Sequence, residues 1–310
     1  MLLKRTRFQA QPVTFSLLLP LSGLLPRRLL ASSAAALCVL LASMCWQAAQ
    51  ARPIDEVVDS GYITIFVYED YAPYSWQDES GEYKGIDVDI ARHFAKSLNV
   101  ELRFLMRGAD ENVDDDFRVN LWKGDLIHRK VADVMMHVPH DRELDTRNEF
   151  VVLMSPYFLE EVAVVANAEK LPKLDTFGRF LNTPIAVELD TVGDFFLSNA
   201  FRGQLHQSVR RGRTFADVVD QYVSGEVPAA MGSKAQTEWI AKQAADFESQ
   251  IHQPPMPGIV RKSWPVGIAI KHDSRDLGYA LTDIATELVL SGEMEKITAA
   301  YGVSFEAPVY

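Results

Sequence analysis

The sequence predicts an α/β fold in which mainly parallel strands are flanked by helices. Segments rich in β-branched and aromatic residues alternate with segments of helical periodicity, which is typical of parallel strands joined by helices. The chain has 310 residues, enough for a substantial core that we expect to be divided between two lobes. No cysteine follows Cys45, so the expected core cannot depend on disulfides.

The amino-terminal residues 1–51 have the pattern of a secretory signal peptide. Arg27 and Arg28 precede an apolar run over 29–48, and an A-x-A pattern ends at Ala51. We therefore expect cleavage after Ala51 and a periplasmic protein, with no membrane insertion afterwards. A membrane anchor is less favoured, because the run is rich in Ala and Ser and is interrupted by a tryptophan and a glutamine.

The charge of the chain restricts its partners. The formal charge is −11, and loss of the leader with its five basic residues changes it to −16. Nucleic acid and anionic membrane surfaces are poor partners for such a charge, whereas a basic protein is an electrostatically suitable one. The same charge is also explained by solubility alone.

The first half of the expected mature chain alternates regularly between strand and helix patterns. We predict strands at 63–68, 100–106 and 131–138, and a helix over 87–98 with its apolar residues on one face.

The second half continues the alternation. Thr191 has the residue type of a helix N-cap, so we place a helix start there. The predicted strands are 162–165, 184–188, 229–231 and 266–270, and the predicted helices are 191–200, 215–222, 233–247, 276–290 and 293–301.

Two stretches contain the most specific motifs. Residues 71–89 read Y-A-P-Y-S-W-Q-D-E-S-G-E-Y-K-G-I-D-V-D, and residues 133–142 read D-V-M-M-H-V-P-H-D-R, followed by S-P-Y at 155–157. In this order they resemble the extracellular solute-binding proteins of family 3, the receptors of ABC importers for polar amino acids. The G-I-D-V-D segment is similar to the family's G-F-D-V-D motif, and G-x-x-x-x-I from Gly292 resembles its terminal helix.

The resemblance implies a two-lobed periplasmic binding protein type 2 fold, each lobe a mainly parallel sheet flanked by helices. Two hinge strands would cross near 158–161 and 262–265. Lobe 1 would comprise 52–157 plus 266–310, and lobe 2 would comprise 158–265. The lobes of such a protein close on a solute by hinge motion.

The resemblance also implies ligand-binding residues. Arg142 follows the third strand, where the family's arginine binds the ligand carboxylate through its planar fork of donors. Tyr71 matches the aromatic residue that stacks on ligand, and Tyr68 ends the strand before it. Thr191 matches the family's helix N-terminus, although Asp190 replaces the usual glycine. Arg142 could equally be a surface residue paired with a neighbouring carboxylate.

Two candidate positions depart from the family. Ser233 stands where amino-acid binders have an aspartate that pairs with the ligand ammonium, and a serine cannot supply that charge. His137 lies where small hydrogen-bond donors are usual, and we expect it in the wall of the cleft. A standard α-amino acid would therefore lack its usual ammonium partner at this position.

Metal sites and cofactors are not expected. His137 and His140 form H-x-x-H beside Asp141, a pattern that can bind zinc or copper, but no third ligand is evident. The acidic run 110–116 lacks the spacing of an EF-hand, which favours a solvated segment.

Three functions follow from these observations. We expect a periplasmic receptor that captures a small polar, carboxylated solute for an ABC importer. The alternative is an accessory protein on the same fold that assists a periplasmic quinoprotein (methanol) dehydrogenase, because V-A-D-V-M-M-H-V-P is similar to the J-type proteins of those systems. An enzyme is not expected, although cyclohexadienyl dehydratases share the fold, because no nucleophile–base pair is evident.

Overall fold

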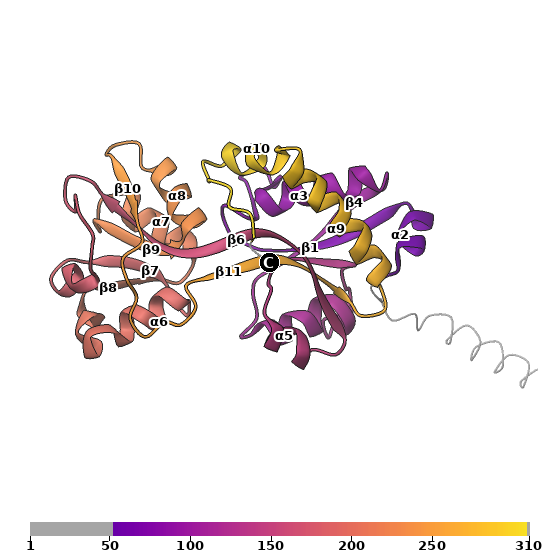
Figure 1. The fold of residues 1–310 in the computed structure, drawn as a ribbon, viewed down its shortest axis with the longest axis horizontal. Coiled ribbons are helices and arrows are strands. Elements are labelled where there is room, and N and C mark those ends of the chain that lie inside the picture. Colours follow the sequence, from indigo (N-terminus) through magenta and orange to yellow (C-terminus); the bar gives the residue numbers. More distant parts are fainter. Residues whose placement is uncertain (1–51, 309–310) are drawn as a thin grey trace, which may run out of the picture. The chain divides into compact units, whose positions relative to one another are not determined.

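The computed structural model describes residues 52–308. The expected signal peptide, residues 1–51, lies outside the described residues. The main sheet has the strand order β4-β1-β5-β11-β6-β9-β7-β8, and β10 pairs with β6 (Figure 1). The expected α/β fold is therefore confirmed.

The first group of strands is parallel. β1 pairs with β4 on one side and with β5 on the other, and all seven residues of β1 are in register with β4. The same part of the chain contains helices α2 and α3, together with the short helices before and after β5. The bounds are β1 (Tyr62–Tyr68), β4 (Glu101–Arg107), β5 (Val134–Pro139), α2 (Ile54–Ser60), α3 (Ile86–Ser97), α4 (Val113–Phe117), the π-helix η1 (Arg118–Trp122) and α5 (Arg142–Arg147).

Two antiparallel strands connect the first group of strands to the second. β6 (Val151–Asn167) is a single strand of 17 residues, which pairs with β11 (Ser263–Lys271) over its first part and with β9 over its last part. The strand expected at 162–165 is thus the end of a much longer one. The segment 158–161 lies in β6, and 263–265 of the segment 262–265 lie in β11, while the expected hinge crossings and lobe boundaries stay a prediction.

The second group of strands repeats the parallel arrangement, because β7 pairs with both β8 and β9. Thr191 is the N-cap of α6, as predicted, and its hydroxyl accepts from the backbone N–H of Asp194. The bounds are η2 (Phe177–Leu181), β7 (Ile185–Glu188), α6 (Val192–Asn199), η3 (Ala200–Gln207), β8 (Val209–Gly212), α7 (Phe215–Val223), β9 (Ala229–Ser233), α8 (Lys234–Gln243) and β10 (Ser249–His252).

The chain returns along β11 to the first group and ends in α9 (Arg275–Leu290) and α10 (Glu293–Ala300). α9 packs against β6 and α3, which places these late residues beside the first strands of the chain. Buried apolar side chains from both regions form one cluster that includes Ile65, Phe94, Ile268 and Leu281. A second cluster, which includes Val164, Phe180 and Val187, fills the other group. Among residues 52–308 no helix is both long and apolar enough to span a membrane.

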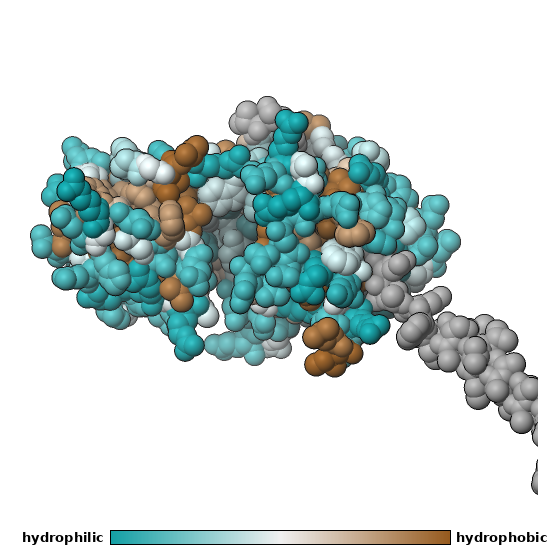
Figure 2. Space-filling model, turned by 90° about the horizontal axis from the view of Figure 1, so that it is seen from below, coloured by the Kyte–Doolittle hydropathy of each residue, from teal (hydrophilic) through white to brown (hydrophobic). Residues whose placement is uncertain are grey.

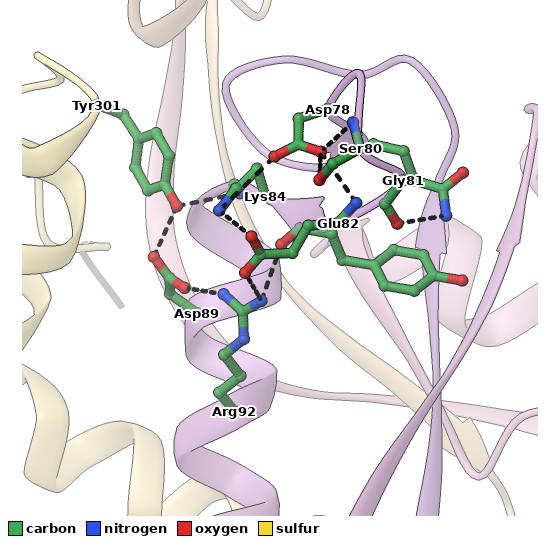
Figure 3. A network of polar contacts seen from close by, with 11 residues as sticks. Asp78, Ser80, Gly81, Glu82, Lys84, Asp89, Arg92 and Tyr301 are labelled. Atoms are coloured by element: carbon green, nitrogen blue, oxygen red, sulfur yellow. Dashed lines mark hydrogen bonds and ion pairs between the residues drawn. The ribbon is translucent and has the colours of Figure 1, made fainter.

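A small hairpin completes the first group, and its polar contacts fix the loop that precedes α3 (Figure 3). The Tyr301 hydroxyl donates to Asp89 at 2.7 Å and accepts from the backbone N–H of Gly85 at 3.0 Å. Arg92 binds Asp89 at 2.6 Å and the Tyr83 carbonyl at 2.8 Å. The chain is thereby anchored directly after the aromatic segment that begins at residue 71. The hairpin strands are β2 (Trp76–Gln77) and β3 (Tyr83–Lys84).

Candidate functional site

A pocket of about 1210 Å³ lies where the parallel strands of both groups end. Ligands of α/β proteins bind at the carboxyl ends of such strands, because the connecting loops leave a crevice there. Residues that follow β1, β4, β7 and β8 line this pocket together with the end of β5 and the start of β11. The lining includes Tyr68, Tyr71, Asp110, His137, Asp141, Glu188, Asp190, Thr191, Arg213, Arg261 and Trp264.

Tyr71 is one of the expected ligand residues that line the pocket. Its backbone N–H donates to the Ser75 carbonyl at 2.8 Å, which closes the loop after β1. Its ring lies 4.9 Å from the ring of Tyr74 and 5.1 Å from the ring of His137, measured between centroids. Tyr68 also lines the pocket, and its hydroxyl donates to Asp116 at 2.9 Å. The aromatic rings in the lining provide a surface on which a ligand can stack.

His137 is in edge contact with the Tyr71 ring and is held by Asp87. The imidazole is 6% exposed and the Asp87 carboxylate is 1% exposed, and their nearest N and O atoms are 3.1 Å apart. The contact is a close charge pair rather than a well-aligned hydrogen bond, because Nδ1 has no hydrogen bond of good geometry. Burial lowers the pKa of His137, but the nearby charges of Asp87 and Glu160 raise it, and the net shift is upward from the ordinary value.

Asp87 is also bound by Tyr157. The Tyr157 hydroxyl donates to Asp87 at 2.6 Å and accepts the His137 backbone N–H at 3.0 Å. His137 has a φ of 58°, an uncommon value for a residue other than glycine. Such a strained backbone persists only where the surrounding structure holds it, and here Tyr157 binds the His137 N–H and Asp87 pairs with its ring.

Ser233 does not line the pocket. It is the N-cap of α8, where its hydroxyl accepts from the backbone N–H of Gln236, and it lies 2.7 Å from the Tyr74 hydroxyl. The Tyr74 hydroxyl also donates to Glu160, which is 2% exposed. Burial raises the pKa of Glu160 to about 7, although the charge of His137 opposes that shift. The buried carboxyl group in this region is therefore that of Glu160 in β6. It lies near Ser233, the position at which the resemblance implied an aspartate that pairs with the ligand ammonium.

Arg142 also lies away from the pocket lining. It is the first residue of α5 and is exposed. Two other arginines, Arg213 and Arg261, line the pocket instead, and Arg261 is paired with Asp141. The Arg213 guanidinium has neither a hydrogen bond nor an ion pair among residues 52–308. Arg213 directly follows β8, a strand that the sequence analysis did not predict.

Thr191 lines the pocket, but its hydroxyl is already engaged. It donates to the Glu188 carbonyl at 2.8 Å and accepts from the Asp194 backbone. Glu188 itself faces the pocket, and burial raises its pKa to about 7. This side of the pocket therefore offers a carboxyl group that changes charge near neutral pH.

The two histidines of the H-x-x-H pattern have different partners. A ring nitrogen of His140 lies 3.0 Å from the Met154 carbonyl, whereas His137 faces Asp87. The described part of the chain has no group of three or more side chains that could bind a metal ion. The acidic run is partly helical, and Asp114 and Asp115 pair with Arg147 and Arg118.

Comparison with known proteins identifies the relatives of the chain. Residues 63–115 match the model of the bacterial extracellular solute-binding proteins, family 3. The comparisons indicate similarity to the family 3 solute-binding proteins over this segment. This match covers the Tyr71 loop, the G-I-D-V-D segment and the start of the acidic run, and it confirms the relationship expected from those motifs.

One relative with an assigned activity matches over a short stretch. A segment of 63 residues is 41% identical to the cyclohexadienyl dehydratase of Pseudomonas aeruginosa, and covers 20% of this chain. The match spans 23% of the length of that relative. This short overlap is a similarity over one segment, and it leaves the activity of this chain to be tested.

Solved structures show the same fold over most of the chain. An ancestral cationic amino acid solute-binding protein has a TM-score of 0.63 at 19% identity, covering 80% of this chain and 98% of that one. An amino acid ABC transporter substrate-binding protein of Streptococcus pneumoniae, bound to L-arginine, has a TM-score of 0.59 at 16% identity, covering 82% and 99%. A solute receptor for L-cysteine of Neisseria gonorrhoeae has a TM-score of 0.57 at 17% identity, covering 81% and 93%. The expected type 2 fold is thus confirmed.

Proposed function

We propose that this protein is a periplasmic receptor that binds a small polar solute for an ABC importer. The observation that supports the proposal best is the pocket at the carboxyl ends of both sets of parallel strands, with the unpaired Arg213 and the ring of Tyr71 in its lining. An unpaired guanidinium beside an aromatic ring suits a carboxylate attached to a small organic body. The family 3 match supports the same function.

The charges of the pocket refine the class of solute. Carboxylates are more numerous than guanidinium groups in the lining, and Glu69, Asp70 and Glu111 have no ion pair among residues 52–308. A solute that also has a positive group would meet these carboxylates while Arg213 binds its carboxylate. We therefore propose a zwitterionic or cationic amino acid, or a molecule of similar size and charge.

We also propose binding without catalysis, although His137 lines the pocket and the pKa of Glu188, raised to about 7, suits proton transfer. Both groups have a simpler use, His137 as a donor to the solute and Glu188 as a partner for a positive group. Incubating protein with the identified solute and measuring the solute mass tests this. Loss of water from the solute would contradict the binding-only proposal.

The accessory role with a quinoprotein dehydrogenase gains no support from the relatives named above. It predicts a protein partner and no response to amino acids. The receptor proposal predicts the opposite, so one solute screen separates them. Copurification with a dehydrogenase and an unchanged unfolding temperature in every solute would favour the accessory role.

The test of the receptor proposal is a thermal-unfolding screen against amino acids, dicarboxylates and sugars. A solute at about a hundredfold its dissociation constant should stabilise the protein by about 2.7 kcal/mol. We expect Arg213→Ala to abolish this shift and Arg142→Ala to retain it, because Arg213 lines the pocket and Arg142 does not. The reverse outcome would restore Arg142 as the carboxylate-binding residue. No shift with any solute would contradict the receptor proposal.

A further inference from the structure

The loop between η1 and β5 exposes two large aliphatic side chains. Leu126 is 92% exposed and Ile127 is 85% exposed, and they are consecutive in the chain. Single exposed aliphatic residues are common on protein surfaces, but an adjacent pair at the tip of a loop is a candidate contact with a partner. Figure 2 shows one face of the molecule, on which hydrophobic residues gather in small groups on a mainly hydrophilic surface.

The loop holds this pair in a defined conformation. Gly124 has a φ of +77°, and a Cβ atom there would lie 2.5 Å from the Arg129 backbone, so the two ends of the loop are in close contact. The Asp125 carboxylate accepts from the backbone N–H groups of Ile127 at 2.9 Å and His128 at 2.5 Å. These contacts fix the loop backbone, so little entropy would be lost when the tip binds a partner.

The charge around the tip is opposite to that of the chain. Lys123, Arg129 and Lys130 are exposed, and their side chains have no ion pair or hydrogen bond in the described part of the chain. The one carboxylate of residues 123–130, Asp125, lies 3.6 Å from the His128 ring and also pairs with Arg107. The full chain has a formal charge of −11, so this loop is a local basic region on an acidic protein.

A recess beside the tip contains two further guanidinium groups. It has a volume of about 490 Å³, and its lining includes Arg107, Arg118, Leu126 and Ile127. Arg107 binds Asp125 at 2.6 Å and Arg118 binds Asp115 at 2.9 Å. A phosphodiester in the recess would lie near both guanidinium groups, while its attached hydrocarbon would lie near the aliphatic pair.

We propose that the loop 123–130 docks this protein on a surface of anionic phospholipid. Basic side chains around exposed aliphatic residues are the arrangement that binds such a surface, through headgroup charge and burial of the apolar tip. The net charge of the chain argues against membranes in general. At physiological salt, however, charges more than about 8 Å away are largely screened, so the loop charge dominates where the loop makes contact.

A protein partner is the other class that fits an apolar tip. Two aliphatic side chains and one narrow loop offer much less than the roughly 800 Å² per partner of a stable protein interface. Weak, reversible membrane association requires no such area. These residues therefore favour a lipid surface, rather than a protein, as the binding partner of the loop.

The test uses protein purified after export from the producing cells and vesicles of phosphatidylcholine with or without phosphatidylglycerol. Co-sedimentation should occur with the anionic vesicles alone and decrease as salt rises. L126S/I127S should weaken partitioning at least about tenfold, and K123Q/R129Q/K130Q by more, since each basic residue contributes about fivefold.

Two variants serve as matched controls. Leu290→Ser removes an aliphatic side chain that is 78% exposed on α9, and K170Q/K173Q removes basic residues elsewhere; both should partition like the wild type. Unfolding temperatures confirm that each variant is folded. Absence of binding to anionic vesicles, or equal loss in the control and loop variants, would overturn the proposal. Binding of the loop to a protein in membranes but not to lipid vesicles would also overturn it.

Discussion

At the scale of single residues, Asp87 has the most consequential contacts of the site. It lies in the first turn of α3, where a negative charge is favourable, and it binds both the His137 ring and the Tyr157 hydroxyl. A buried carboxylate with two polar partners keeps its neighbours in fixed positions. The imidazole that faces the pocket is therefore oriented by a residue 50 positions earlier in the chain.

Asp87→Asn tests this arrangement. The substitution leaves His137 without its charge partner, so we expect the free energy of unfolding to fall by about 3 kcal/mol. Urea denaturation measures the loss. Asp59→Asn, at an exposed position of α2, should change it by less than about 0.5 kcal/mol. Equal effects of the two substitutions would show that Asp87 has no special role.

Glu160 gives a prediction about pH. Its pKa in the folded protein is about 7, above the value of about 4.3 expected when unfolded, so the folded state binds this proton more tightly. The stability that it contributes is present below pH 4 and is lost as pH rises through 7. Urea denaturation at pH 5 and pH 8 should therefore show lower stability at pH 8.

Glu160→Gln isolates that contribution. Glutamine does not titrate, so the difference in unfolding free energy between pH 5 and pH 8 should shrink by about 2 kcal/mol. The pKa values of Glu188 and His137 are also raised, so part of the decrease in unfolding free energy with rising pH remains in this variant. If the difference in unfolding free energy between pH 5 and pH 8 stays the same in Glu160→Gln, Glu160 is ionised throughout this pH range.

The sequence could predict only some of these residues. Tyr71, Tyr68, Thr191 and His137 line the pocket as their positions in the motifs implied, although their contacts with a ligand stay a prediction. Arg213 was missed because no local motif surrounds it, and its location follows from the pairing of β8 with β7. Contacts such as that between Glu160 and Tyr74 join distant residues and depend on tertiary structure.

At the scale of elements, the strands and helices with clear hydrophobic periodicity were predictable. The strand expected at 63–68 is observed as Tyr62–Tyr68, and the helix expected at 87–98 as Ile86–Ser97. The hairpin of β2 and β3 was not predicted, since each strand has two residues and no periodicity. The 17-residue β6 was also not predicted, because Ser155 and Pro156 interrupt its apolar pattern.

Gly85 determines how the aromatic loop meets α3. Its φ is +127°, and a Cβ atom there would lie 2.1 Å from the Tyr74 carbonyl oxygen. Gly85→Ala should therefore lower the free energy of unfolding by about 3 kcal/mol and weaken solute binding, because Tyr71 and Tyr74 belong to the displaced loop.

Gly81→Ala is the matched control for Gly85→Ala. Gly81 also has a positive φ, +82°, but nothing lies within 4 Å of its Cβ position. Gly81→Ala should therefore lower the free energy of unfolding by only about 1 kcal/mol, which is the cost of a left-handed backbone conformation for alanine. Chemical denaturation of both variants makes the comparison, and similar losses would contradict the role given to close packing at Gly85.

At the scale of the whole described chain, the segment after α10 connects distant elements. The Leu159 backbone N–H donates to the Glu306 carbonyl at 3.0 Å, and Ser304 binds Glu238 of α8 at 2.6 Å. Glu306 also pairs with Lys234 of α8. In Figure 1 this segment descends from α10 toward β6 and β11. We infer that it restrains motion between α8 and the first group of strands.

Truncation tests this restraint. Ending the chain at Gly302 removes the buried Val303 and the contact of Phe305 with Phe158, so the free energy of unfolding should fall by about 3 kcal/mol. Ending it at Glu306 keeps these contacts and should cost less than about 1 kcal/mol. Urea denaturation of both truncated proteins distinguishes the two cases, and equal stability would contradict the inference.

The most direct test of the account is calorimetric titration of the solute found in the screen into wild-type protein, Tyr71→Ala and Tyr279→Ala. Tyr71 lines the pocket, whereas Tyr279 is 60% exposed on α9 and absent from the lining. Loss of stacking should weaken binding by about 2 kcal/mol, close to thirtyfold, in Tyr71→Ala and leave Tyr279→Ala unchanged. Wild-type affinity in Tyr71→Ala would show that the solute binds elsewhere, and would contradict the proposed site.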